Sequence, residues 1–196
     1  MNGPLSLPNL FTYFRLAAVP AVVACFFWGG AFSANDHNAR WTALGIFTLA
    51  AITDYIDGWV ARRFDKTTSL GGMLDPIADK LLVSACLLLL AADGTIAGWS
   101  LWAAIIILCR EILVSGLREF LGNVRVKVPV SALAKWKTVA QLIALGFLLA
   151  GPAGDRVLPH NTDIGLTLLW LSALLTLYTG WDYMKAGVTT VVESDR

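Results

Sequence analysis

Six long apolar stretches dominate this sequence and limit what the chain can fold into. An apolar helix needs roughly 20 residues to cross the hydrocarbon core of a bilayer, and each stretch is close to that length. The stretches cover residues 9–30, 41–63, 73–92, 98–120, 133–152 and 163–186. Only short polar breaks separate them, without a long linker or an internal repeat. The sequence therefore predicts one all-α membrane domain over residues 1–196, a bundle of six transmembrane helices with an interfacial segment at residues 1–8.

The charged residues support a membrane location and indicate an orientation. Only 15% of the residues are charged, whereas globular domains carry roughly 25%. With the N-terminus in the cytoplasm, all of the 15 lysines and arginines except Arg40 and Arg156 lie inside or toward the cytoplasmic half. This positive-inside asymmetry predicts that both termini are cytoplasmic, as in a multi-pass protein of a bacterial-type cytoplasmic membrane. The net charge of +1 and the scattered basic residues predict no nucleic-acid surface.

Four aspartates flank the polar break between the second and third stretches. Asp54 and Asp57 are three residues apart, and Asp75 and Asp79 are four apart, so each pair shares one helix face. Carboxylates gathered in a poorly solvated site repel one another unless cations balance them. Hard oxygen ligands suit Mg²⁺ or Mn²⁺, and four carboxylates are enough for two such cations, which together clamp phosphoryl oxygens. The spacing therefore predicts a site with two divalent cations and a phosphate-bearing substrate.

The residues between the two aspartate pairs fit a phosphate ligand. Arg62 and Lys66 offer positive charge to a diphosphate, and Thr67 can hydrogen-bond to a phosphate or a base. Small residues allow a ligand to approach the backbone closely: Gly58, Ala61 and Gly71. Simpler interpretations exist for single residues, since Asp75 before Pro76 also fits a helix N-cap. Arg62 alone also fits an interfacial anchor. Neither interpretation explains all four acids at these spacings.

The segment resembles the motif of the CDP-alcohol phosphotransferase family, D-x2-D-G-x2-A-R-x8-G-x3-D-x3-D. Every position of the motif is filled, by Asp54, Asp57, Gly58, Ala61, Arg62, Gly71, Asp75 and Asp79. The resemblance implies six transmembrane helices around a cytoplasm-facing polar active-site cavity. It also implies transfer of a phosphatidyl or similar group from a CDP-linked donor to an alcohol, with release of CMP, by a protein that forms a homodimer.

The resemblance further implies roles for the motif residues. Asp54, Asp57 and Asp75 are expected to bind metal, and Asp79 is expected to bind metal and to act as the general base. The CDP-linked donor is expected to contact Asp54, Gly58, Ala61, Arg62, Lys66, Thr67, Gly71 and Asp75.

Basic residues around the polar break after the fourth stretch suggest where the acceptor binds. Arg110 and Arg118 are eight residues apart and lie close to one helix face, and Lys135 begins the next stretch. Several cations aimed into a cavity suit an acceptor that itself carries a phosphate. Interfacial snorkelling and pairing with neighbouring glutamates is the simpler interpretation, and it applies more strongly to Lys137 and Arg125.

Sequence segments spread over the whole chain resemble one branch of the family. The segments LPNLFTYFRL, REILVSGLREFL and KWKTVAQ imply CDP-diacylglycerol as donor and sn-glycerol 3-phosphate as acceptor, in phospholipid biosynthesis. One departure is Ala134, which stands where a glycine is expected. Thr12 and Arg15 are expected to line the site together with Asn9, although a helix start explains Asn9 equally well.

Two kinds of alternative stay open. A synthase of the same family could use inositol phosphate, serine, or phosphatidylglycerol (in cardiolipin synthesis) as its acceptor, although an unphosphorylated acceptor does not require three cations. A small cation transporter would need charged or broken helices on both sides of the midplane. Residues 81–90 and 105–108 instead continue as uninterrupted apolar runs, which argues against transport.

Overall fold

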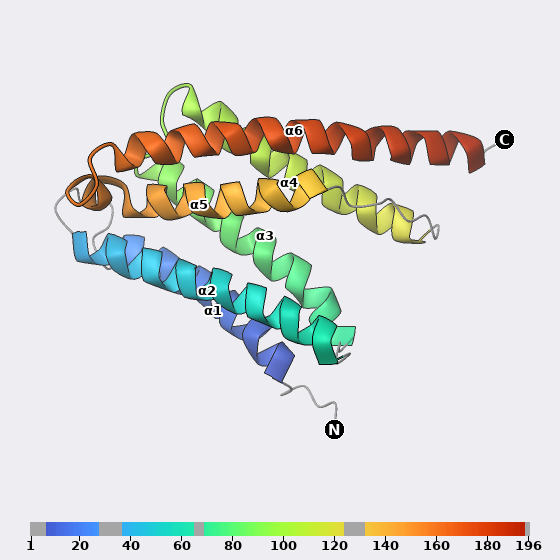
Figure 1. Ribbon diagram of the computed structural model, residues 1–196, viewed down its shortest axis with the longest axis horizontal. Helices are drawn as coiled ribbons and strands as arrows, with labels where there is room; N and C mark the ends of the chain where they lie inside the picture. The colour runs from blue at the N-terminus through green and yellow to red at the C-terminus, as the bar shows by residue number, and fades with distance from the viewer. Residues whose placement is uncertain (1–6, 28–36, 65–68, 124–131, 195–196) are drawn as a thin grey trace.

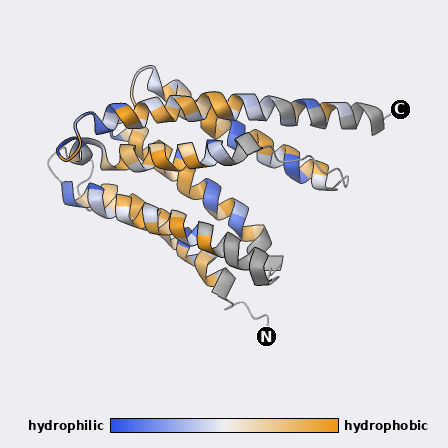
Figure 2. Cartoon of the chain, in the orientation of Figure 1, coloured by the Kyte–Doolittle hydropathy of each residue, from blue (hydrophilic) through white to orange (hydrophobic). Residues whose placement is uncertain are grey.

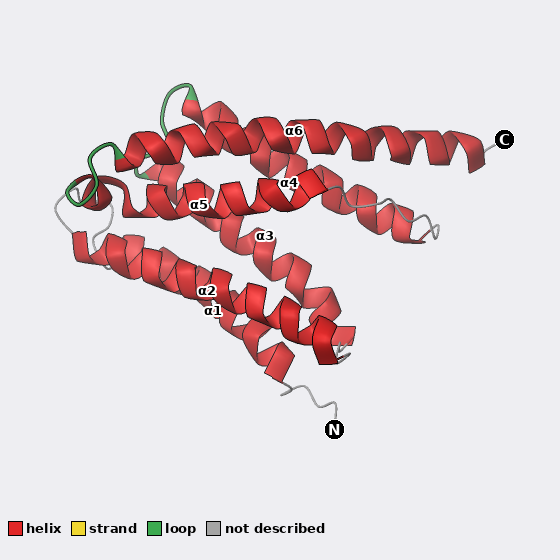
Figure 3. Cartoon of the chain, in the orientation of Figure 1, coloured by secondary structure: helices red, strands yellow, loops and turns green. Residues whose placement is uncertain are grey.

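The computed structural model describes residues 7–27, 37–64, 69–123 and 132–194, and all the regular structure in these ranges is helical (Figures 1 and 3). The helices are α1 (Leu7–Phe27), α2 (His37–Phe64), α3 (Ser69–Ala92), α4 (Ser100–Asn123), α5 (Ala132–Asp155) and α6 (Asn161–Ser194). Each overlaps one predicted apolar stretch, so the all-α fold with six helices is confirmed.

Several helices have the length and apolarity of membrane spans. Among the described residues this holds for segments of α1, α4, α5 and α6: Leu10–Phe27, Ser100–Gly122, Trp136–Asp155 and Asn161–Thr189. α2 and α3 contain 28 and 24 residues but carry the aspartate motif, which interrupts their apolar surface. Figure 2 shows hydrophobic residues along most of the helices, with hydrophilic positions inside α3 and α4. The chain is therefore a membrane protein with polar groups enclosed in its bundle.

The helices pack in a connected arrangement around an apolar core. α5 packs along α6, α4 packs on α6, and α2 packs on α5. Within the described residues, α1 packs against both α2 and α3 and so joins the two helices that carry the aspartates. The largest apolar side chains in the core are buried almost completely: Phe26, Leu87, Leu90, Ile107, Leu145, Leu148, Leu149 and Leu169.

The start of α3 differs from the simplest interpretation of its sequence. Asp75 before Pro76 fits an N-cap, but α3 begins six residues earlier, at Ser69, with Pro76 inside the helix. Capping therefore does not explain Asp75. Membrane helices tolerate an internal proline, because neighbouring helices and side chains compensate for the lost backbone hydrogen bond. Asp75 is consequently free to direct its carboxylate toward a neighbouring helix.

A buried ion pair joins the helices at the end where α2 begins and α3 ends. Arg40 donates to the Asp93 carboxylate and to Thr95 Oγ1, the latter at 3.3 Å. Its guanidinium also lies over the Phe26 ring, 5.8 Å from the centroid. α5 kinks nearby at Gly151, which has φ 44° and where a Cβ atom would lie 2.5 Å from Arg40 Nη1. Only glycine combines this backbone conformation with such a close approach.

Candidate functional site

The aspartates of α2 and α3 are held by polar side chains of α1. Arg15 Nη2 lies 2.7 Å from Asp54 Oδ1, and Thr12 Oγ1 donates a hydrogen bond to Asp75 Oδ1. The Arg15 side chain is 1% exposed, whereas that of Asp54 is 45% exposed. Thr12 and Arg15 are three residues apart and share a face of α1. Their predicted position beside the aspartates is confirmed, and α1 is the helix that brings Asp54 and Asp75 into one site.

Asp79 on α3 has charged neighbours on α1, α2 and α4 as well as on its own helix. It is partly buried, and Arg15, Asp54, Glu111 and Lys80 are close enough to act on it electrostatically. A general base must come within hydrogen-bond reach of the acceptor hydroxyl, so the catalytic role of Asp79 stays a prediction.

Other predicted site residues fall outside what the structure describes. The side chains of Asp57, Gly58, Ala61, Arg62, Gly71 and Lys135 are not described, and Lys66 and Thr67 lie outside the described residues altogether. Among the side chains that are described, no three acidic, histidine or cysteine groups form a metal-ligand cluster. The metal site is therefore still a prediction that needs Asp57. Its donor chemistry fits a hard divalent cation, because the described acids offer carboxylate oxygens alone.

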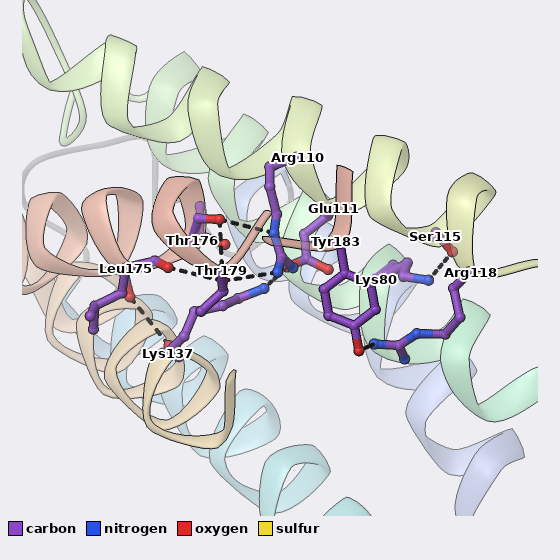
Figure 4. A network of polar contacts seen from close by, with 11 residues as sticks. Lys80, Arg110, Glu111, Ser115, Arg118, Lys137, Leu175, Thr176, Thr179 and Tyr183 are labelled. Atoms are coloured by element: carbon purple, nitrogen blue, oxygen red, sulfur yellow. Dashed lines mark hydrogen bonds and ion pairs between the residues drawn. The ribbon is translucent and has the colours of Figure 1, made fainter. Parts of the chain in front are cut away.

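Arg110 is held by two contacts with α6 and one with Glu111 on its own helix. Its Nε donates to the Thr176 carbonyl at 3.1 Å, and its Nη2 donates to Thr179 Oγ1 at 3.0 Å. Its Nη1 lies 3.4 Å from Glu111 Oε1. Gly180 makes room for this arrangement, since a Cβ atom there would lie 3.1 Å from Arg110 Cγ. The guanidinium therefore has a defined orientation inside the bundle (Figure 4).

Lys137 is buried and paired with Glu111, so the snorkelling part of its simpler interpretation is wrong, whereas pairing with a glutamate is confirmed. Its side chain is 6% exposed, and its ammonium group is ion-paired with Glu111 Oε1. A side chain that snorkels to the membrane surface would be exposed at its charged end. The sequence offered a signal that could have identified Lys137, because an ionisable residue within an apolar span is functional by default.

Two further cations complete the group. Arg118 Nη2 lies 3.4 Å from the Tyr183 hydroxyl, and its guanidinium is 5.5 Å from the centre of the Tyr183 ring. Lys80, the residue after Asp79, donates to Ser115 Oγ. Figure 4 shows these residues in one region between α3, α4, α5 and α6. We call it the cation cluster, and it consists of Lys80, Arg110, Arg118 and Lys137 around Glu111. It confirms the proximity of Arg110 and Arg118, whereas Lys80 and Glu111 were not predicted as site residues.

In this helical membrane bundle, carboxylates of the kind that can bind metal ions lie beside cations of the kind that can bind phosphate. This combination is typical of one class of protein. Residues 5–178 match the model of the CDP-alcohol phosphatidyltransferase family. The match includes both aspartate pairs and the whole cation cluster. The chain belongs to this family.

Three named relatives show which members of the family this chain is similar to. The CDP-diacylglycerol–glycerol-3-phosphate 3-phosphatidyltransferase of Rickettsia bellii is 43% identical over 181 residues, which cover 92% of this chain and 94% of the relative. A protein of the same name from Cereibacter sphaeroides is 35% identical over 213 residues, with coverage of 92% and 94%. The cardiolipin synthase (CMP-forming) of Oryza sativa subsp. japonica is 38% identical over 198 residues, which cover 92% of this chain and 57% of the relative.

Proposed function

We propose that this protein transfers the phosphatidyl group of CDP-diacylglycerol to sn-glycerol 3-phosphate, giving phosphatidylglycerophosphate and CMP in anionic phospholipid biosynthesis. The observation that carries the proposal is the cation cluster beside Asp79, because a phosphorylated acceptor needs several cations next to the base. The names of the relatives from Rickettsia bellii and Cereibacter sphaeroides support the same donor and acceptor.

The donor side of the site uses the aspartate motif. Two divalent cations, Mg²⁺ or Mn²⁺, would be held by Asp54, Asp57, Asp75 and Asp79, and when bound they supply positive charge for the donor diphosphate. Arg15 and Thr12 orient the carboxylates of Asp54 and Asp75. The remaining donor contacts are assigned to Gly58, Ala61, Arg62, Lys66, Thr67 and Gly71.

The acceptor side positions the attacking hydroxyl. The acceptor phosphate is assigned to Arg110, Arg118 and Lys135, and Asp79 takes the proton from an acceptor hydroxyl group. The deprotonated oxygen forms a bond to the β-phosphorus of CDP-diacylglycerol. At the same time the bond from that phosphorus to the bridging oxygen breaks, and CMP leaves with the electron pair. Asp79 lies within electrostatic reach of both groups of residues, which supports this division of roles.

The proposal includes a location and an assembly. The protein is placed in a bacterial-type cytoplasmic membrane as a homodimer among membrane lipids, with both termini and the site facing the cytoplasm. The distribution of lysine and arginine supports this orientation. It also places the site in the compartment where water-soluble phosphorylated acceptors are available.

A CMP-release assay with a panel of acceptors tests the proposal. Purified protein in detergent micelles that contain CDP-diacylglycerol is supplied with Mg²⁺ and, separately, with glycerol 3-phosphate, inositol phosphate, serine or phosphatidylglycerol. We expect CMP release with glycerol 3-phosphate and little release with the others. Phosphatidylglycerol is the second candidate because of the Oryza sativa relative. Release with any other acceptor and none with glycerol 3-phosphate would refute the proposed acceptor while leaving family membership intact.

A further inference from the structure

We propose that Glu111 is a positioning residue for the acceptor phosphate, an inference that rests on the proposed function. Glu111 does not touch the phosphate in this proposal. It holds Arg110 on α4 and Lys137 on α5 at the separation and in the orientation in which they bind a phosphate monoester. The proposal thereby adds Lys137 to the residues assigned to the acceptor phosphate above.

The contacts of Glu111 place it between two cations. Its Oε1 atom is ion-paired with Lys137 Nζ on α5 and lies 3.4 Å from Arg110 Nη1 on α4. The three side chains are 10%, 20% and 6% exposed for Arg110, Glu111 and Lys137. Two cations brought this close in a poorly solvated interior repel each other strongly. In the part of the chain that the structure describes, Glu111 is the one acid ion-paired with either cation, and so it offsets this repulsion.

Arg110 and Lys137 have more N–H donors than their described contacts use, so donors remain for a ligand. A guanidinium has five N–H donors and an ammonium has three. The described contacts of Arg110 use one donor on each of its three nitrogen atoms, which leaves one on each terminal nitrogen. These N–H groups can donate hydrogen bonds to the oxygens of a phosphate. Lys137 uses one donor on Glu111 and keeps two.

The charge of the cation cluster fits the same ligand. The cluster holds four cations and one carboxylate, and Asp79 is a second acid close enough to Lys137 to act on it electrostatically, so two positive charges are not balanced by these acids. A phosphate monoester brings a charge of about −1.5 to −2 at neutral pH, and it therefore neutralises most of this excess. Glu111 lowers the total attraction for the phosphate, but it keeps the cations together before the acceptor arrives.

The experiment compares Glu111→Gln with a matched control, Glu119→Gln. Glu119 is an exposed acid on the same helix and lies outside the cation cluster. We expect the KM for glycerol 3-phosphate to rise about tenfold or more in Glu111→Gln, the effect of losing a charge-assisted hydrogen bond. The KM for CDP-diacylglycerol should stay within about twofold, because donor contacts come from α2 and α3. The control should change neither KM.

Two additional variants separate positioning from a purely structural role. Glu111→Asp retains the charge and should raise the KM for glycerol 3-phosphate less than Glu111→Gln does. In a Lys137→Met background, Glu111→Gln should raise the KM for glycerol 3-phosphate by a smaller factor, because one of the two cations that Glu111 holds is gone. Glycerol 3-phosphate should raise the Tm of the wild type but raise that of Glu111→Gln less at the same concentration.

The outcomes are distinguishable from failure of the proposed function. A wild type that releases no CMP with glycerol 3-phosphate refutes the function and the inference together. A wild type that is active, with an unchanged KM for glycerol 3-phosphate in Glu111→Gln, overturns only the inference, and so does an equal rise in the KM for both substrates. If Glu111→Gln does not fold, Glu111→Asp decides the matter, because its shorter side chain moves the carboxylate away from both cations. A rise in the KM for glycerol 3-phosphate alone supports positioning, and an equal rise in the KM for both substrates overturns it.

Discussion

Replacing Arg40 by methionine tests whether the buried ion pair with Asp93 anchors the bundle. The Arg40 and Asp93 side chains are 6% and 1% exposed, so both charges are shielded from solvent. Methionine keeps an unbranched apolar stem but removes the charge. Asp93 then keeps only its hydrogen bonds from the Thr95 N–H and hydroxyl groups, at 2.8 and 3.0 Å.

The magnitude follows from these contacts. Removing one partner of a buried ion pair costs about 3–5 kcal/mol, and the two hydrogen bonds that remain on Asp93 favour the lower end of that range. Loss of the contact between the guanidinium and the Phe26 ring adds roughly 0.5–1 kcal/mol. For a chain of this length, each kcal/mol shifts the Tm by about 2–4 °C. We therefore expect Arg40→Met to lower the Tm by roughly 7–16 °C.

Thermal unfolding in detergent, followed by the fluorescence of the eight tryptophans, measures this shift. Arg156→Met is the control, because Arg156 is an exposed arginine near the same end of the bundle. The double variant Arg40→Met/Asp93→Asn should lose less than the two single variants combined, since it leaves no buried charge unpaired. A Tm within about 2 °C of the wild type for Arg40→Met, or an equal loss in the control, would refute an anchoring role for the pair.

Three further predictions concern the site. Asp79→Asn should abolish CMP release while the protein still binds CDP-diacylglycerol, because the base is lost but most donor contacts remain; full turnover would remove Asp79 from its catalytic role. Thr12→Val should raise the KM for CDP-diacylglycerol severalfold, since it removes the hydrogen bond with which Thr12 orients the Asp75 carboxylate. An unchanged KM would show that Asp75 is positioned without Thr12. Gly180→Leu should lower kcat/KM for glycerol 3-phosphate by displacing Arg110 from its contacts on α6, whereas an equal loss for CDP-diacylglycerol would point to general disruption.

Much of the fold could be predicted because the length of an apolar stretch is itself a structural constraint. A span of roughly 20 apolar residues predicts a helix whatever its neighbours are, and all six helices overlap the predicted stretches. The position of α1 between α2 and α3 could not be predicted in this way. It depends on which faces pack together, and the hydropathy of α1 does not specify a partner. Thr12 and Arg15 were expected to line the site only because of the resemblance to the family. The start of α3 at Ser69 was missed for a similar reason, since the Asp75–Pro76 pair fits both a helix start and a helix interior.

The candidate site likewise has one part that the sequence predicts and another part that depends on how the helices pack. The spacings within the pairs Asp54/Asp57 and Asp75/Asp79 are visible in the sequence because one helix face carries residues three or four positions apart. The ion pair between Glu111 and Lys137 joins two helices, and its existence depends on how α4 and α5 are placed around α6. No spacing within either helix encodes that placement. Lys137 was consequently interpreted as an interfacial residue although it is buried.

The balance of charge at the two ends of the bundle explains why one end serves as an anchor and the other as a site. Where α2 begins, a single cation, Arg40, meets a single carboxylate, Asp93. The two charges neutralise each other, so this pair needs no ligand. Toward the other end, several cations surround Glu111, and a separate group of aspartates is held on α1 by Thr12 and Arg15. Excess positive charge and excess negative charge in neighbouring parts of an apolar bundle are costly to maintain. They become favourable when an anion binds to the first and cations bind to the second, so this imbalance is what the proposed reaction requires.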